Sequence, residues 1–338
     1  MNAWGALVAR ARGLSGHLLA PGTLRSLAGS EDRRDFTDAL VRLGYLAFPP
    51  NAPAPDEHAT EVAIRRVAAR RFAVLARWSR DCGDVLQPLL EDEDRRSLRA
   101  ILRGALGHVP HEMRTAGLIP TAALPARALD ELALLNDVGA IGAALLALGH
   151  PFGRAVAEAA RRERPDLFAL DQAIGRAWAV RACEAGVRAD AALRHYVERT
   201  IDLQNYWAAR LLAEQHADAS PDAVFLPGGR LVAVDDLRYA VDTKSAARLV
   251  ARLARRAAGT ALAAALSPRP HDPDDAALTA LIGEFRTRGL HAPLGLSFVI
   301  LYILRVRAEQ RALRRTLWQL ALGVPTDLRV RAYEEAAA

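Results

Sequence analysis

The sequence repeats itself at an interval of about 105 residues. Residues 24–44 align with residues 129–149 at a constant offset of 105, with eight identities in 21 positions and no gap. A weaker third copy begins at Leu226, which aligns with Leu124. Repeats of this size are structural units that each bury an apolar face against a neighbour. The sequence therefore predicts three similar units, and three units can close on themselves.

A short acidic pattern recurs at nearly the same interval. It consists of an acid, two intervening residues, a small or amide residue and then an apolar residue. The acid is Asp94 in the first copy, Asp202 in the second and Glu309 in the third, 108 and 107 residues apart. The second copy carries the amide Asn205. Together the two markers predict three domains with the approximate limits 1–110, 111–218 and 219–338.

Composition favours helix in all three units. Hydrophobic residues make up 51% of the chain and charged residues 25%, so the chain can bury a large core and is not disordered. Its 338 residues exceed the roughly 250–300 that one core holds. Alanine, leucine and arginine dominate, and no segment sustains the apolar and polar alternation of a strand. We therefore expect an all-α protein of three pseudo-repeated helical bundles.

The most regular helical pattern lies in residues 292–323. Apolar residues recur there at intervals of three and four, and only Gln310 breaks the series. The stripe consists of Leu296, Val299, Ile303, Val306, Leu313, Leu317 and Leu320. Pro293 starts the segment and Gly323 ends it, as expected of helix boundaries. Its apolar run, 294–304, falls short of the roughly 20 residues that span a bilayer, so we expect burial in protein.

A basic row lies opposite this apolar stripe. It consists of Arg307, Arg311 and Arg314. The formal net charge of +6 suits an acidic partner, but arginine also keeps an Ala/Leu-rich helical surface in contact with water. Charge alone therefore does not predict nucleic-acid binding.

Cysteine usage and the N-terminus indicate the compartment. Cys82 and Cys183 lie far apart and neither belongs to a CxxC motif, which argues against zinc and against a disulfide framework. Arginines at positions 10 and 12 interrupt the N-terminal apolar run, so we expect no signal peptide. The sequence predicts a cytoplasmic chain without a transmembrane segment of its own.

An enzyme is one alternative. Asp202, Asn205 and Arg210 would form a carboxylate, amide and arginine cluster on one helix, as in all-helical enzymes that bind Mg²⁺-diphosphate. Such sites need several carboxylates that converge on the metal, and the acids at 235–236 and 272–275 lie in turn-like settings. We expect no catalytic, cofactor or metal site. The alternatives are a free-standing helical scaffold that binds protein or nucleic acid, and an all-α Mg-dependent enzyme.

Several short motifs follow one another in the order and spacing of one known family. They are Trp4, Arg10, Arg12, Leu18-Leu19 and Tyr45; Leu170-Asp171; Ile201-Asp202-Leu203-Gln204-Asn205; Pro227-Gly228-Gly229; and Pro293-Leu294, Tyr302, Glu309, Arg311, Leu313-Arg314 and Leu322-Gly323. In this arrangement the chain resembles the C subunit of V-type and A-type rotary ATPases, whose eukaryotic counterpart is subunit d. The sequence departs from the family at Ser97, Ala308 and Ala312, where the family usually carries Asn.

The resemblance implies a fold and a role. It implies an all-helical, pseudo-three-fold funnel on the cytoplasmic face of the membrane, between the central-shaft subunits and the proteolipid ring. Such a protein is a non-catalytic rotor adaptor for ATP-linked proton or sodium transport, and it binds no nucleic acid.

The resemblance also implies where the partners bind. We expect Asp94, Asp202, Asn205 and Glu309 to line a polar wall that receives the shaft. The basic row of Arg307, Arg311 and Arg314 would then meet the ring loops. The alternative is that each acid only braces its own helix, through a nearby arginine such as Arg99 or Arg314.

Overall fold

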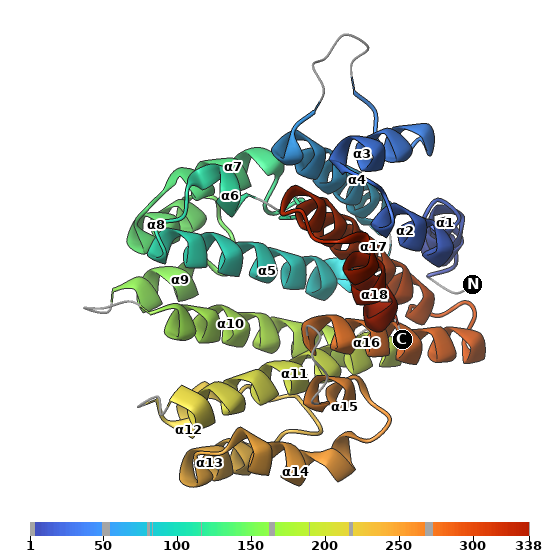
Figure 1. Cartoon of the computed structure of the whole chain (residues 1–338). Coiled ribbons are helices and arrows are strands. Elements are labelled where there is room, and N and C mark those ends of the chain that lie inside the picture. Colours follow the sequence, from blue (N-terminus) through green and yellow to red (C-terminus); the bar gives the residue numbers. More distant parts are fainter. Residues whose placement is uncertain are drawn as a thin grey trace.

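The fold is known from a computed structural model. It describes the following residues: 4–48, 55–79, 82, 84–115, 117–161, 166–188, 190–215, 219–267 and 273–337. These ranges hold 18 α-helices and no strand, which confirms the prediction of an all-α protein (Figure 1). None of their helices is long and apolar enough to cross a membrane.

Six of the helices are long and follow one another in pairs. They are α4 (Glu57–Trp78) and α5 (Gln87–Leu106), α10 (Leu167–Arg188) and α11 (Ala191–Gln215), and α16 (Pro273–His291) and α17 (Ser297–Ala321). The first pair is joined through the 3₁₀ turn η2 (Asp84–Leu86). Each pair belongs to a different third of the chain, in agreement with the interval of the sequence repeat.

Shorter helices precede and follow these pairs. The shorter helices of the first third are α1 (Gly5–Ser15), α2 (Pro21–Ala28) and α3 (Arg33–Arg42). Those of the second are α6 (His111–Arg114), α7 (Ala126–Leu134), α8 (Val138–Ala147) and α9 (Gly153–Ala160). Those of the last are α12 (Pro221–Val224), α13 (Val234–Thr243), α14 (Ala246–Ala257), α15 (Ala261–Leu266) and α18 (Thr326–Ala337).

The starts of the short helices recur at fixed intervals. Helices α7 and α8 begin 105 residues after α2 and α3, and α13, α14 and α15 begin 108 residues after α7, α8 and α9. The N-cap residues Asp32, Asp137 and Ser245 occupy the same place before α3, α8 and α14, where each side chain accepts a backbone N–H. The helices of the third copy begin six residues later than an alignment of Leu226 with Leu124 predicts. The reason is the longer loop between Leu226 and α13.

The packing of the helices groups them differently from the sequence repeat. Helix α5 packs against α6, α7, α8 and α10. Helix α11 packs against α12 to α15, and helix α17 packs against α1 to α4. The second long helix of each pair therefore joins the short helices that follow it in the repeat, and α17 returns to the start of the chain (Figure 1). The domain limits 1–110, 111–218 and 219–338 and the three-fold funnel stay predictions, since the packing groups are displaced from those limits by one long helix.

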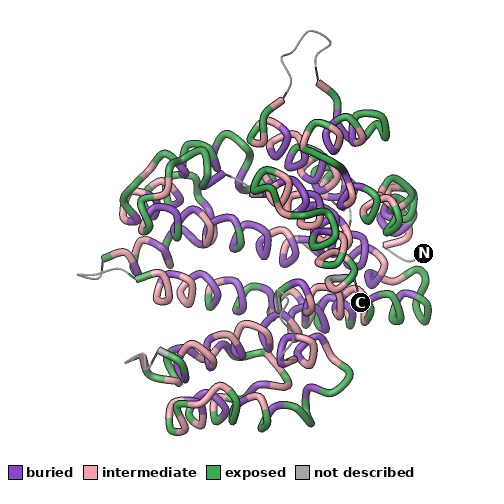
Figure 2. Tube along the Cα trace, viewed as in Figure 1, coloured by how far each residue is buried: buried purple, intermediate pink, exposed green. Residues whose placement is uncertain are grey.

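Apolar burial follows this grouping. The first halves of α11 and α17 contribute to a large central cluster that also includes α5 and α10. Their second halves enter separate clusters, α11 with α13 and α14, and α17 with α2, α3 and α4. Figure 2 shows buried residues running along the long helices, while exposed residues gather on the outer short ones. The long helices therefore hold the groups together.

Two helix starts differ from the sequence prediction. Helix α17 begins at Ser297, four residues after the predicted start at Pro293, and six of the seven residues in its apolar stripe are buried. The sequence also predicts a helix that follows Asp94 and runs to about Gly104, whereas helix α5 begins at Gln87, with Pro88 in its first turn. The acids that precede Asp94 are therefore helical. The prolines of residues 49–55, PPNAPAP, predict a linker or surface loop, but this segment lies outside the described residues except for Pro55.

Candidate functional site

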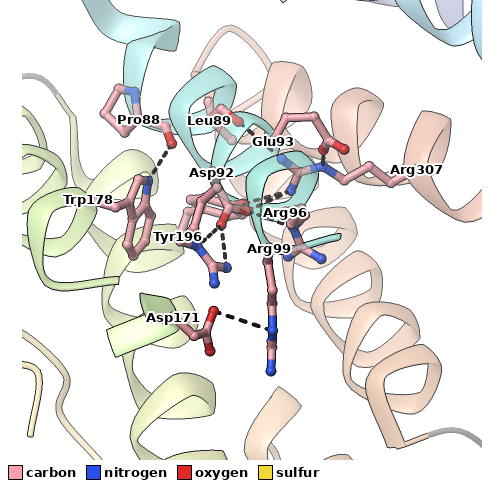
Figure 3. A network of polar contacts seen from close by, with 11 residues as sticks. Pro88, Leu89, Asp92, Glu93, Arg96, Arg99, Asp171, Trp178, Tyr196 and Arg307 are labelled. Carbon is pink, nitrogen blue, oxygen red and sulfur yellow. Dashed lines mark hydrogen bonds and ion pairs between the residues drawn. The ribbon is translucent and has the colours of Figure 1, made fainter. Parts of the chain in front are cut away.

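Arg307 lies at a junction between α5, α11 and α17 (Figure 3). Its Nε donates to Glu93 Oε2 at 2.7 Å, its Nη1 to the Tyr196 hydroxyl at 2.8 Å, and its Nη2 to the Leu89 carbonyl at 3.1 Å. The same Nη1 lies 3.1 Å from Asp92 Oδ2. Arg307 is only 4% exposed. One guanidinium from α17 thus binds residues of α5 and α11.

Asp92 is the acid at the centre of this junction. It is fully buried, and besides Arg307 it pairs with Arg95 at 2.7 Å and Arg96 at 3.2 Å and accepts the Tyr196 hydroxyl at 2.6 Å. Burial acts to raise the pKa of Asp92, but the three guanidinium groups and the phenol outweigh it and hold the pKa far below its usual range. Asp92 therefore stays ionised at any physiological pH.

The other two members of the basic row make ion pairs within the chain. Arg311 donates to Asp275 Oδ1 at 2.9 Å, and Arg314 pairs with Glu61. Both arginine side chains remain about a third exposed, at 33% and 31%. Arg307 is buried and does not share a surface with them. The predicted basic row is wrong in this respect.

Asp94 ties α5 to the loop before α7. Its Oδ1 accepts the Thr121 hydroxyl at 2.6 Å, and its Oδ2 lies 3.5 Å from His150 Nε2. The same Thr121 oxygen accepts the Leu124 N–H at 3.0 Å, so the loop is closed on itself before the helix begins. Burial raises the pKa of Asp94 more than its hydrogen bonds lower it.

Asp202 ties α11 to the loop before α13. Its Oδ1 accepts the backbone N–H groups of Arg230 at 2.9 Å, Leu231 at 2.8 Å and Val232 at 3.2 Å. A Cβ atom on Gly229 would lie 2.5 Å from that oxygen, so only glycine lets the chain approach it. Burial raises the pKa of Asp202, against the lowering effect of the three N–H groups.

Glu309 ties α17 to the loop before α2. Its Oε2 accepts the Leu19 N–H at 2.6 Å, and its Oε1 pairs with Arg71 of α4. Arg71 also donates to the His17 carbonyl at 2.7 Å, so the end of the α1 to α2 segment is held from two sides.

The three acids share one structural role. Asp94, Asp202 and Glu309 are at most 3% exposed, and each binds the loop that leads into a pair of short helices in its own packing group, which is α7 and α8, α13 and α14, or α2 and α3. This agrees in part with the bracing alternative, since Asp202 lies 3.6 Å from Arg199 on its own helix, but the two arginines named for that role pair with other acids. Arg99 lies 3.3 Å from Asp171, and Arg314 pairs with Glu61. The three carboxylates are therefore buried in this chain, and Glu309 also lines a cavity of about 390 Å³.

The amide position of the acidic pattern differs between the copies. Asn205 donates to the Leu226 carbonyl at 2.8 Å and accepts its N–H at 2.9 Å, a second tie between α11 and the α13 loop. Among the described residues, the buried hydroxyl of Ser97 has no hydrogen-bond partner, and Ala312 lines a cavity of about 390 Å³. The corresponding positions of α5 and α17 therefore do not reproduce the Asn205 contact within the described part of the chain.

The residues of the enzyme alternative do not converge. Arg210 pairs with Glu214 near the surface, away from the backbone groups that Asp202 and Asn205 bind. The acids at 235–236 and 274–275 lie in the first turns of α13 and α16, not in turns, and Asp272 is outside the described residues. In the described part of the chain, no group of three or more His, Cys, Asp or Glu side chains could hold a metal ion.

Sequence reasoning missed most of the junction. Neither Asp92 nor Glu93 was a candidate, nor was Tyr196, nor Trp178, whose Nε1 donates to the Pro88 carbonyl at 2.9 Å. One signal was present in the sequence. A proline in the first turn marks a helix start, so Pro88 would have extended α5 back over both acids.

Comparison with known proteins gives a match across nearly the whole chain. A family model described as the ATP synthase (C/AC39) subunit matches residues 7–329. The matched range includes the junction, the three acids and all helices from α2 to α17. A search of curated proteins finds no match.

Proposed function

Because the chain belongs to the ATP synthase (C/AC39) subunit family of V/A-type ATPases, we propose that it is a non-catalytic rotor adaptor. In this role it couples the central-shaft subunits to the membrane proteolipid ring, on the cytoplasmic face, for ATP-linked proton or sodium transport. The match over residues 7–329 is the observation that carries the proposal. The adaptor performs no bond chemistry of its own.

The internal ties suit a part that transmits torque. A rotor adaptor has to pass rotation from one partner to the other without changing shape. The Arg307 junction joins α5, α11 and α17. Each of these helices is in turn joined to the loop ahead of a short-helix pair, by Asp94, Asp202 and Glu309 respectively. Such charge-assisted, buried hydrogen bonds are stiffer and stronger than exposed ones. They support a rigid body.

The proposed partner surfaces then lie on other residues than the acids. Asp94, Asp202, Asn205, Glu309 and Arg307 act on a partner only through the shape that they hold. Arg311 and Arg314 keep a third of their side chains in contact with solvent, so they remain our candidates for contact with the ring loops. Their internal partners mean that a charge reversal there also disturbs the fold.

Membrane vesicles from cells with and without this chain test the proposal. Without the chain, we expect the catalytic sector to leave the membrane, so that it still hydrolyses ATP but drives no ion uptake. The full chain should restore uptake, and so should the control Arg127→Ala, which loses only an exposed pair with Glu131. Undiminished ATP-driven ion uptake without the chain would overturn the adaptor role.

Copurification separates this role from the alternatives. The adaptor role predicts copurification with the shaft and ring subunits, and a gene neighbourhood that encodes them. Salt-dependent retention on nucleic acid without those subunits would instead favour the free-standing scaffold.

A further inference from the structure

A cavity of about 690 Å³ lies between α11, α16 and the start of α17. Its lining residue Arg199 connects it to one of the three acids, because Arg199 Nη1 lies 3.6 Å from Asp202 Oδ2. Its charged lining comes from α11, with Asp190, His195 and Arg199, and from α16, with Glu284, Arg288 and His291. The turn before α15 and the start of α17 add only uncharged residues, among them Gly259 and Ser297. The cavity therefore carries two histidines and two arginines beside two acids.

The hydrogen bonds of His195 define its protonation state. Arg288 Nη2 lies 3.1 Å from His195 Nδ1, and since a guanidinium can only donate, Nδ1 is the acceptor. The proton therefore sits on Nε2, which donates to Glu284 Oε2 at 2.6 Å. His195 is a neutral imidazole in this arrangement, and it is only 8% exposed.

Both acids of the cavity accept hydrogen bonds within the chain. Glu284 accepts the Ala261 N–H at 2.6 Å and lies 3.3 Å from Arg199, in addition to His195. Burial acts to raise the pKa of Glu284, but these partners outweigh it and the pKa is lowered. Asp190 accepts the Ala192 N–H at 2.6 Å, at the start of α11.

Arg288 is the cation that remains uncompensated. Its contact is the neutral His195, and no acid pairs with it among the described residues. Its side chain is exposed in the cavity, beside the exposed His291. The starts of α11 and α17 also line the cavity, and the positive ends of their dipoles add to this charge.

We propose that this cavity binds a dianionic oxyanion, such as the phosphoryl group of a small phosphorylated molecule. Arg288 leaves His195 Nδ1 and pairs with the anion. The freed Nδ1 takes a proton from solvent and donates to the same anion, while Nε2 keeps its bond to Glu284. Binding of one anion is thus coupled to the uptake of one proton. The site belongs to the chain by itself and does not depend on the adaptor role.

Sulfate is the first probe, because it stays a dianion over the range in which histidine titrates. Calorimetry on the full chain should show tighter binding as the pH falls from about 8 to about 5, by up to tenfold per unit, since one proton is linked. Titrations in two buffers of different ionisation enthalpy should count that proton. Inorganic phosphate should compete at the same site.

Two variants and one control locate the site. Arg288→Gln should weaken sulfate binding at least tenfold. His195→Gln should leave weaker binding with a smaller dependence on pH, since His291 still lines the cavity. Arg286→Gln is the matched control, because Arg286 is exposed on the same helix but lines a different cavity, and it should bind like the wild type. Circular dichroism melting checks that each variant is folded. No saturable binding, equal affinity in Arg288→Gln, or binding without proton uptake would each overturn the proposal.

Discussion

Replacing Arg307 with methionine should destabilise the protein more than the same replacement of any other arginine on α17. Methionine keeps the aliphatic stem but removes the three hydrogen bonds and the pair with Asp92. Asp92 retains Arg95 and Arg96, whereas Glu93, with an 8% exposed side chain, loses its guanidinium partner. Removing one partner of a buried pair costs about 3–5 kcal/mol.

This free energy converts into a measurable melting shift. At roughly 2.1 cal/mol/K of unfolding entropy per residue, cooperative unfolding of 338 residues gives about 0.7 kcal/mol/K. Arg307→Met should therefore lower Tm by about 4–7 °C in scanning calorimetry. The control is Arg305→Met on the same helix, since Arg305 is half-buried and has no ion pair in the part of the chain that the structure describes. It should shift Tm by less than about 1 °C.

A double variant tests the cause. If the loss comes from an uncompensated Glu93, then Arg307→Met with Glu93→Met should recover a large part of it, because a buried pair replaced as a whole is often tolerated. Equal melting temperatures for Arg307→Met and Arg305→Met would refute the reasoning.

Four further substitutions have defined outcomes. Gly229→Ala should destabilise the protein by about 1–3 kcal/mol in urea unfolding, because the added Cβ would lie 2.5 Å from Asp202 Oδ1. Gly13→Ala should instead stabilise α1 by up to about 1 kcal/mol, because a Cβ added there would meet no atom of the described residues within 4 Å. Asn205→Ala should cost about 2–3 kcal/mol in the same assay, since it leaves a buried N–H and a buried carbonyl unpaired. Burial raises the pKa of Tyr302 to about 12, above its ordinary value of 10.0, so the stability linked to its proton is complete below pH 10 and is lost as the pH rises towards 12. Tyr302→Phe should weaken that alkaline loss. Because the buried Tyr302 hydroxyl has no hydrogen-bond partner in the ranges that the structure describes, this variant should not lower stability at pH 7 in thermal melts.

Local patterns in the sequence were enough to predict the helices. The period of the apolar stripe predicted α17 to within four residues at its start. The repeat of 24–44 at 129–149 predicted that these two segments are equivalent, and the structure adds that Asp32 and Asp137, which match in that alignment, cap α3 and α8. Both signals lie within about one helix of sequence, where spacing alone decides which side chains share a face.

The site depended on contacts that spacing cannot show. Helical periodicity placed Arg307 opposite the apolar stripe, but its partners Asp92 and Glu93 lie more than 200 residues away in the sequence. A helix that is surrounded on all sides also buries its polar face, and the sequence of that helix alone does not predict this burial. The recurring acids were found, yet the loops that they bind differ in length and composition, so their roles could not be predicted.

The return of α17 to the start of the chain has a consequence for biosynthesis. Helices α1 to α4 leave the ribosome first, but the helix that covers their apolar face begins 219 residues after Trp78. Since translation proceeds at about 5–20 residues per second, this apolar face stays uncovered for roughly 10–45 seconds until α17 is synthesised. During that time Phe36, Leu40 and Ile64 lack the side chains of Leu313 and Leu317 that bury them in the finished protein. We therefore expect chaperones to bind the N-terminal segment of the nascent chain until synthesis is nearly complete.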